Sequence, residues 1–424
     1  MCVVRIFGLL VLSAACVARL SAQHPALDPA FENVPFEQWL GEHDAGRFHW
    51  SVKVPRAELS FHQRLISSID VRLDGQDLDT RRADGKLLLL IQVTDAAGNR
   101  YREHGEIDLS KVDKDVKEAN LDYSQRAFLL PGEYQLAVAL FDKTSGEHSL
   151  IQQQFRMPPA HDFLMLAWRG LPAVEFIGND VSPESWYLPY IQGRLQWAES
   201  VRSPARLNVI LNLAPSRRAS SAYLAALLPS LKVMSQTGSP ALSERVALLD
   251  LSRRRTVFDQ NDVNDLDWPR LKSSLGEANT ASIDVHSLGD RHEDAQFFVS
   301  EVRRVLRASA DKPCVLVVLT KPISFDSGED LDPVSLEALP PCRVVYLRYH
   351  FPPPSIGPMV GPQMGGRGRR SRMGDDPLMR NRPMQDAFDQ LEATLKPLSP
   401  KVIDVETPEQ VTKALTEIEK ALLK

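Results

Sequence analysis

The sequence of 424 residues lacks several features that mark specialised protein classes. It has only 4 cysteines, which excludes a fold held by dense disulfides. Lysine and arginine (50) nearly balance aspartate and glutamate (55), so no overall basic field favours nucleic acid or an anionic membrane. No apolar run reaches the length of about 20 residues that crosses a bilayer comfortably. What remains is a globular composition over a length that predicts two or three domains.

Motifs of catalytic sites are also missing. The sequence has no GxSxG nucleophile elbow, no glycine-rich phosphate loop and no CxxC pair. The segment that starts at His292 begins like a zinc-protease helix, but Gln296 stands where the second histidine ligand must be. We therefore expect a non-enzymatic protein without a cofactor. An enzyme of an unrecognised class is the alternative.

The N-terminal segment has the pattern of a secretory signal peptide. One positive charge at Arg5 precedes an apolar run over residues 6–18, and small residues end at Ala22. We expect residues 1–22 to be cleaved, which places the mature chain outside the cytoplasm, secreted or periplasmic, with no membrane span. The alternatives are an uncleaved anchor and lipid attachment at Cys16, which follows a partial lipoprotein box.

Residues 46–158 read as short alternating strands separated by polar turns, which predicts an antiparallel β-sandwich of the immunoglobulin-like kind. The step Pro131-Gly132-Glu133-Tyr134 resembles the PGxY turn of such modules, in which the tyrosine hydroxyl ties down a corner. An acidic turn contains Asp74, Asp77 and Asp79. It reads as a solvated hairpin tip, since it lacks the glycine and distal glutamate of an EF-hand calcium loop.

Residues 159–204 are rich in proline and large aromatic rings, Trp168 among them. So many rings are unusual for a flexible linker, and we expect this connector to pack across a domain junction. A sugar-binding shelf of aromatic side chains is the functional alternative.

From residue 205 to 424 the period changes to apolar strand-like runs that alternate with amphipathic helical stretches. Runs such as VLVVL and RVVYL are apolar on both faces, which is typical of parallel strands covered by helices. The pattern predicts a doubly wound, Rossmann-type α/β sheet. A Gly-, Pro-, Met- and Arg-rich insertion at 352–383 interrupts it and should form a flexible loop.

The elements follow one another as a strand and its loop, a helix, the strand-turn-strand VALLDLSRRRTVFDQ, further helices, a strand that ends in Leu-Thr, another strand and a final strand-helix pair. This order resembles a von Willebrand factor A (VWFA) domain, and it is similar to the divergent VWFA-related exported proteins of acidobacteria. In that family two loops contribute carboxylates, from DxSxS and LTDG, to a divalent cation that meets a partner's carboxylate.

This chain departs from the family at both carboxylate positions. Asn212, Ala214 and Ser216 stand in the place of DxSxS, and Thr320 is followed by Lys321 where LTDG has its aspartate. Without the carboxylates little compensates a dehydrated cation, and an ammonium group repels one. We therefore predict a degenerate site without metal. Either the Lys321 ammonium occupies the cation's region and meets a carboxylate itself, or Lys321 is a solvated loop residue.

The resemblance also bears on the two cysteines that follow the signal segment. In the family's strand order Cys314 and Cys342 begin neighbouring parallel strands. Matching starts imply Cα atoms within disulfide reach, about 5 to 6 Å apart. A disulfide and two buried free thiols are the alternatives.

The insertion offers two local signals. Its arginines resemble RNA-binding tracts, but export makes RNA an improbable partner. Thioethers are soft ligands for Cu(I), so copper binding is a further alternative to a plain flexible loop. The five methionines concerned are Met359, Met364, Met373, Met379 and Met384.

The resemblance and the missing catalytic motifs together predict a protein-binding or scaffold protein of the bacterial cell envelope. Its partner would be another envelope protein, and neither nucleic acid nor a cofactor is expected. Open α/β sheets place their sites at the carboxyl ends of the parallel strands. The binding residues are therefore expected at the degenerate metal-loop positions.

Overall fold

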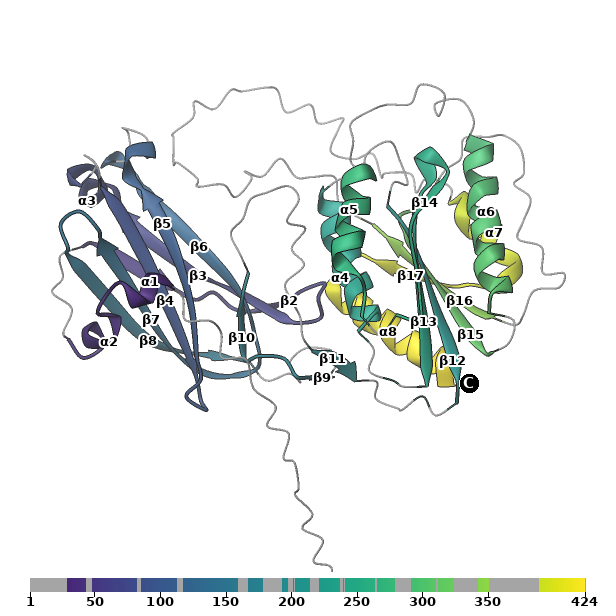
Figure 1. Cartoon of the computed structure of the whole chain (residues 1–424), viewed down its shortest axis with the longest axis horizontal. Coiled ribbons are helices and arrows are strands. Elements are labelled where there is room, and N and C mark those ends of the chain that lie inside the picture. Colours follow the sequence, from purple (N-terminus) through teal and green to yellow (C-terminus); the bar gives the residue numbers. More distant parts are fainter. Residues whose placement is uncertain are drawn as a thin grey trace, which may run out of the picture.

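The computed structural model describes most of the chain between residues 29 and 423 (Figure 1). The described residues are 29–42, 48–81, 85–112, 117–158, 167–177, 193–196, 201, 203–213, 221–236, 239, 241–263, 265–278, 291–309, 312–323, 342–350 and 389–423. A β-rich N-terminal part is followed by an α/β domain, as the sequence predicts at this level. Within the described ranges, no helix combines the length and the apolar character that crossing a bilayer requires.

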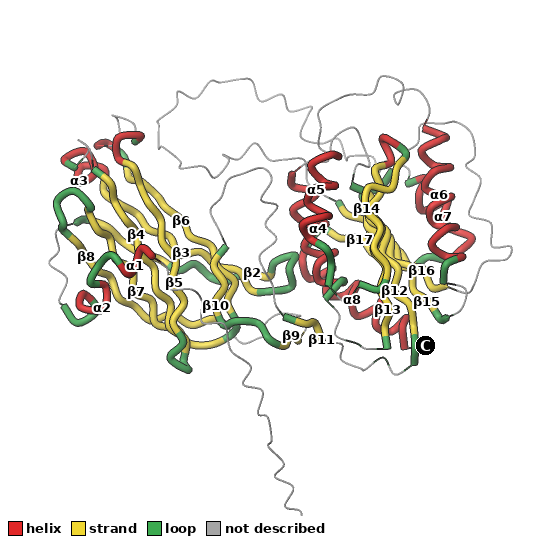
Figure 2. The backbone as a smooth tube through the Cα atoms, in the orientation of Figure 1, coloured by secondary structure: helices red, strands yellow, loops and turns green. Residues whose placement is uncertain are grey.

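Two antiparallel sheets form the N-terminal part, which we call the two-sheet domain (Figure 2). The first sheet has the order β1 (Trp50–Lys53), β3 (Leu65–Asp74), β6 (Asn120–Leu129) and β10 (Val174–Phe176), and β2 (Glu58–Leu59) pairs with β3. The second has the order β5 (Arg100–Asp108), β4 (Lys86–Asp95), β7 (Gly132–Asp142) and β8 (His148–Met157). A continuous apolar core lies between the two sheets and contains side chains of both.

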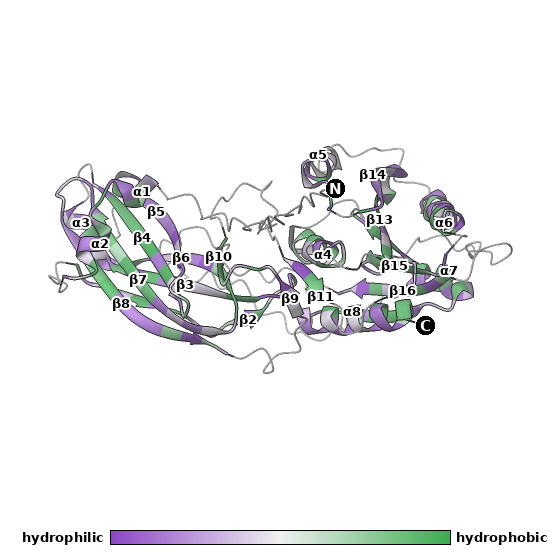
Figure 3. Cartoon of the chain, turned by 60° about the horizontal axis from the view of Figure 1, so that its bottom comes forward, coloured by the Kyte–Doolittle hydropathy of each residue, from purple (hydrophilic) through white to green (hydrophobic). Residues whose placement is uncertain are grey.

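Strands β4 and β7 are apolar on both faces because each face is covered (Figure 3). Alternate β4 residues from Leu87 to Val93 point into the core between the sheets. Leu88 and Leu90 point outward, against helices α1 (Pro29–Glu32) and α2 (Phe36–Trp39). These two short helices precede the region from which the sequence predicts a sandwich. Their aromatic side chains cover a face that would otherwise expose leucine to water.

Tyr134 ties down a corner of the two-sheet domain, as the PGxY turn predicts. Its buried hydroxyl lies 2.7 Å from the carbonyl oxygen of Leu130, to which it donates a hydrogen bond, and 3.2 Å from that of Ala173. Strand β10 starts directly after Ala173 and pairs with β6. The first sheet thus continues into the segment that we expected to be connector. The sequence does not reveal β10, because a strand of 3 residues is too short to show an alternating pattern.

Six strands form the central sheet of the α/β domain, and five of them are parallel. Their order is β14 (Arg255–Asn261), β13 (Leu242–Asp250), β12 (Ala205–Asn212), β15 (Cys314–Thr320), β16 (Cys342–Tyr349) and β17 (Lys401–Val405). Strand β14 is the antiparallel edge. The chain builds outward from β12 in one direction and then from β15 in the other, so the winding reverses between these two strands.

Helices cover both faces of this sheet, which explains why its strands are apolar throughout (Figure 1). On one face lie α4 (Ser221–Met234), α5 (Trp268–Ala278) and α8 (Pro408–Leu423). On the other lie α6 (Arg291–Arg307) and α7 (Gln390–Leu395). All seven residues of β15 are buried between the two helical layers.

The two parts meet at a turn that inserts Gln63 of the two-sheet domain against α8. The Gln63 side chain is fully buried and bonds at both ends of its amide. Its Nε2 donates to the carbonyl of Pro408 at 2.9 Å, and its Oε1 accepts from the Thr412 hydroxyl at 2.5 Å. Trp168 of the connector donates its Nε1–H to the Gln63 carbonyl at 3.1 Å. We call these contacts the Gln63 clasp. Trp168 thus packs at the junction as expected, and the other tryptophans and tyrosines of residues 159–204 lie outside the described residues.

Lys232 of α4 is a buried lysine at the same junction. Its ammonium nitrogen lies 5.2 Å from the centre of the Trp268 ring. The pKa of Lys232 is lowered from 10.5 to about 8, mainly by burial, while the charge of Glu175 raises it and that of Arg64 lowers it.

This shift predicts a stability that depends on pH. Between pH of about 8 and 10.5 the unfolded chain keeps a proton on Lys232 that the folded protein has released. The free energy of unfolding should therefore rise with pH across this window, by about 2 to 3 kcal/mol. Urea unfolding at several pH values measures it. The Lys232→Met variant should lack this part of the rise, and an identical pH profile in both proteins would contradict the prediction.

Candidate functional site

The carboxyl ends of β12 and β15 form the candidate site. These two strands pair in parallel at the centre of the sheet, where the winding reverses. In open α/β sheets a ligand crevice lies outside the carboxyl ends of the strands at this point. Strand β12 ends at Asn212 and β15 ends at Thr320. The topology therefore brings together two loop starts that are distant in the sequence.

Asn212 and Thr320 bond to each other through their side chains. The Asn212 amide nitrogen donates to the Thr320 hydroxyl oxygen at 3.2 Å, and both residues are fully buried. The Thr320 hydroxyl in turn donates to the carbonyl of Lys321 at 3.2 Å. The neutral Asn212 thus stands at one of the two positions where the VWFA resemblance implies a metal carboxylate, and Thr320 directly precedes the other, Lys321.

Lys321 follows Thr320 directly and is only partly exposed. Burial lowers the pKa of its ammonium group from 10.5. A partly desolvated ammonium is more strongly attracted to a carboxylate than one in bulk water, because the surrounding dielectric is lower. The expected positions Ala214 and Ser216 lie outside the described residues, and so do the insertion with its five methionines, the signal segment and Cys16.

The described donors at these strand ends, a side-chain amide, a hydroxyl and an ammonium group, do not fit a divalent cation. The neighbouring strand β13 ends in a carboxylate, that of Asp250, which lies 3.7 Å from Arg253 and 3.8 Å from Arg255. No group of three or more His, Cys, Asp or Glu side chains that could hold a metal occurs in the described part of the chain. The absence of a metal stays a prediction that rests on the amide and ammonium groups present.

A second polar cluster lies at the same edge, at the ends of β16 and β17. Arg348 bonds to Asp404 at 2.6 Å and to Glu392 at 2.8 Å. The bond to Asp404 raises the pKa of Arg348 and lowers that of Asp404. His350 also contacts Asp404, with 2.6 Å between Nε2 and Oδ1.

Asp389 links this cluster to α7. It accepts hydrogen bonds from the Tyr346 hydroxyl at 3.0 Å and from the backbone N–H of Leu391 at 3.2 Å, as the N-cap of that helix. Burial raises the pKa of Asp389. The cluster fastens α7 to the sheet. Sequence reasoning missed it because the insertion at 352–383 separates its two halves, although polar residues at the end of the apolar run VVYLRYH are a signal.

Cys314 and Cys342 stand opposite each other as the first residues of β15 and β16. They form a disulfide with 4.7 Å between their Cα atoms. The bond lies at the amino ends of the strands, at the edge opposite Lys321. Its place indicates a structural role.

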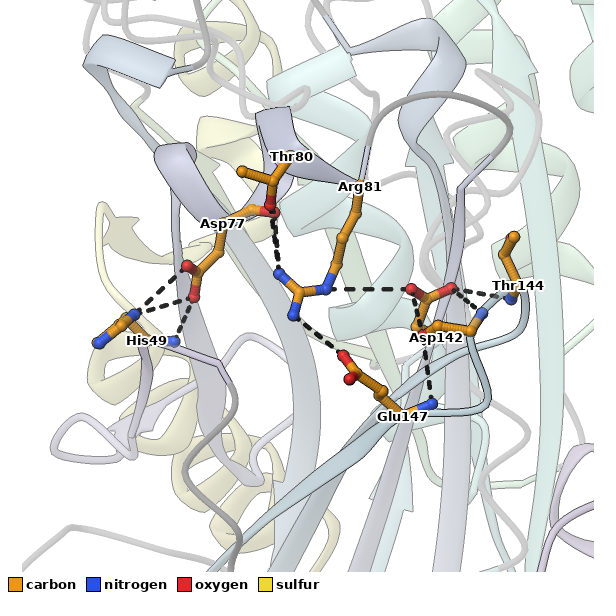
Figure 4. Close-up of polar contacts among 8 residues, drawn as sticks. His49, Asp77, Thr80, Arg81, Asp142, Thr144 and Glu147 are labelled. Atoms are coloured by element: carbon orange, nitrogen blue, oxygen red, sulfur yellow. Dashed lines mark hydrogen bonds and ion pairs between the residues drawn. The ribbon is translucent and has the colours of Figure 1, made fainter.

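A third polar network lies at the end of the two-sheet domain that carries α3 (Gly75–Thr80) (Figure 4). Asp77 accepts from the backbone N–H of His49 at 2.5 Å. Arg81 reaches Glu147 at 3.2 Å and Asp142 at 4.0 Å, and Asp142 is buried and caps the turn at Thr144. The predicted hairpin tip is wrong here. The acidic turn is a short helix, because its strands β3 and β4 belong to different sheets and the chain must cross between them.

Comparisons with known proteins find similarity among solved structures. No family model matches the chain, and no curated protein matches it. The ArnB paralog VWA2 from Sulfolobus acidocaldarius is similar over 52% of this chain and 40% of its own, at 12% identity and a TM-score of 0.22. A protein assigned as ApaA from Bordetella pertussis matches over 26% and 94%, at 13% identity and 0.19. A glycosyl hydrolase family 2 member from Bacteroides cellulosilyticus matches over 72% and 42%, at 10% identity and 0.19.

Proposed function

We propose that the chain is an exported, non-enzymatic protein of the bacterial cell envelope that binds another protein through a VWFA-like domain without the family's metal. The binding surface is the edge around Asn212, Thr320 and Lys321. A carboxylate of the partner meets the Lys321 ammonium. The N-terminal part acts as an immunoglobulin-like domain, for which the Tyr134 hydroxyl bonded to Leu130 is the supporting feature.

One observation carries this proposal. At the reversal point of the sheet, the strand ends that would hold acidic metal ligands in a VWFA domain carry a bonded asparagine–threonine pair and a partly buried lysine. The ammonium group supplies positive charge at the position where the family uses a cation. Burial lowers the pKa of this ammonium group, and a partner's carboxylate would favour its charged form.

Replacing Lys321 by alanine is expected to lower partner affinity by roughly tenfold, because a half-buried charge contact is lost. To measure this, the tagged chain is treated with a cross-linker in envelope extract. The readout is the amount of one defined partner band, which mass spectrometry identifies. Lys413→Ala is the matched control, since Lys413 is an exposed lysine on α8.

Two further results distinguish this contact from a metal-dependent one. Higher salt should weaken capture because ions screen the charge pair. Chelation with EDTA should leave it unchanged. Equal capture by wild type, Lys321→Ala and Lys413→Ala would overturn the assignment of Lys321, and loss of capture with EDTA would overturn the metal-free site.

A further inference from the structure

Strand β8 forms one edge of the second sheet in the two-sheet domain. Among the described strands it pairs only with β7, in the order β5-β4-β7-β8. The ladder runs without a register shift over ten residues from His148 to Met157. Its stretch from Ile151 to Phe155 has neither a charged residue nor a proline. Such an edge presents backbone N–H and C=O groups that another strand can bond.

The other described edge strands carry the features that discourage pairing. Strand β5 has charged side chains along most of its length. Strand β14 pairs with β13 through a register shift at Leu248 and Leu249. Strands β1, β10 and β17 have 4, 3 and 5 residues. Short, bulged or charged edges resist association, so β8 stands apart as the long one, with an uncharged middle from Ile151 to Phe155.

The hairpin geometry tells which β8 residues face outward. Asp142 N–H bonds to the Glu147 carbonyl at 2.9 Å and closes the hairpin between β7 and β8. Hydrogen-bonded pairs alternate along an antiparallel ladder. Counting from Glu147, the backbone groups of Gln152, Gln154 and Arg156 therefore point away from β7. Their side chains are exposed on the outer face of the sheet.

We propose that β8 pairs antiparallel with β8 of a second copy of this chain, about a two-fold axis at Gln154. In this register Gln154 faces Gln154 of the second copy, and Gln152 faces its Arg156. All outward groups of these three residues are then bonded, and the pairing leaves out Ser149 and Leu150. The second sheet of one copy then joins the second sheet of the other into one continuous sheet, through an isologous contact.

The side chains agree with this register on both faces. On the inner face Ile151 lies opposite Met157, so apolar side chains meet. On the outer face the exposed Arg156 makes no ion pair with any described residue. Opposite it stands Gln152 of the second copy, whose amide donates to the Leu40 carbonyl at 3.0 Å. Glu42 contacts His148 of the same strand, with 3.2 Å between Oε2 and Nε2, so the edge of β8 that receives Arg156 of the second copy also carries a carboxylate.

A cysteine at the axis tests the register directly. A chain that begins at Gln23 and keeps the disulfide between Cys314 and Cys342 has no free thiol that could compete with the introduced cysteine. Gln154→Cys should form a cross-linked dimer under mild oxidation, because residues facing each other lie about 5.5 Å apart between Cα atoms. Gln153→Cys is the matched control, since its side chain lies on the other face and off the axis. Cross-linking of the control but not of Gln154→Cys would overturn the register.

Sedimentation equilibrium over a dilution series from about 1 to 100 µM measures the association itself. We expect a monomer–dimer equilibrium. Gln154→Lys places two ammonium groups at the axis and should weaken dimerisation by at least tenfold, whereas His104→Lys on the opposite edge strand β5 should leave it unchanged. Circular dichroism of each variant establishes that it folds. A wild-type chain that stays monomeric throughout, or a dimer unaffected by Gln154→Lys, would overturn the proposal.

Discussion

Replacing Glu175 by alanine is expected to lower the free energy of unfolding by about 3 to 5 kcal/mol, because it leaves a buried arginine without its counter-ion. Arg64 is 2% exposed and donates to Glu175 through Nη1. Its Nε and Nη2 atoms are buried with no acceptor among the described residues. The Phe128 ring, 4.6 Å from the guanidinium carbon, gives only partial compensation. Burial already lowers the pKa of Arg64.

Urea unfolding followed by circular dichroism measures this loss. Glu58→Ala is the matched control, because Glu58 lies on the neighbouring strand β2 and is exposed. The double variant Arg64→Met/Glu175→Leu should be much more stable than Glu175→Ala, since it removes the charge together with its partner. If Glu175→Ala were as stable as Glu58→Ala, the ion pair between Arg64 and Glu175 would not contribute to the free energy of unfolding.

Replacing Cys314 and Cys342 by serine is expected to cost about 2 to 4 kcal/mol of stability. The disulfide closes a loop of 28 residues in sequence separation and joins two strands at the centre of the α/β domain. Without it the unfolded chain gains conformational freedom, while the folded sheet keeps its other contacts. In thermal unfolding, reductant should lower the stability of the wild type by a similar amount, and it should leave the stability of the double variant unchanged.

Intact mass after alkylation tests the bond chemically. The denatured chain that begins after Ala22 should take up alkylating reagent at two sites only after reduction. Uptake without reductant would show two free thiols, which is the alternative that the sequence leaves open. A double variant as stable as wild type would contradict the predicted energetic effect even if the bond forms.

The sequence predicts those parts of the fold that local patterns encode. Short strand-like runs mark β1, β3, β4 and β6 to β8, and runs apolar on both faces mark β12, β15 and β16. The largely charged strand β5 has no such pattern and is not predicted. The sequence also does not reveal β10, which has 3 residues, or the packing of α1 and α2. These elements exist through contacts with strands distant in the chain. The same holds for the turn at Gln63, whose left-handed φ of 56° is stabilised by bonds to α8 and Trp168.

At the candidate site, the residue types could be predicted but not all of their contacts. The positions of Asn212 and Lys321 follow from a resemblance in element order, and the structure adds the Asn212–Thr320 hydrogen bond. The cluster around Arg348 and Asp389 requires knowledge of which loop ends meet. Charged residues are too frequent in this chain for spacing alone to select them.

The Gln63 clasp affects how firmly the protein would bind a partner that carries repeated binding sites. It bonds the two-sheet domain to the start of α8, at the edge that also carries the proposed Lys321 contact. Two copies joined along β8 would then hold two such edges at a fixed spacing rather than on independently moving arms. A ligand whose repeats match this spacing gains a high effective concentration for its second contact, and one with another spacing gains none. A junction held in this way would turn a weak single contact into selection for the number and spacing of the partner's binding sites.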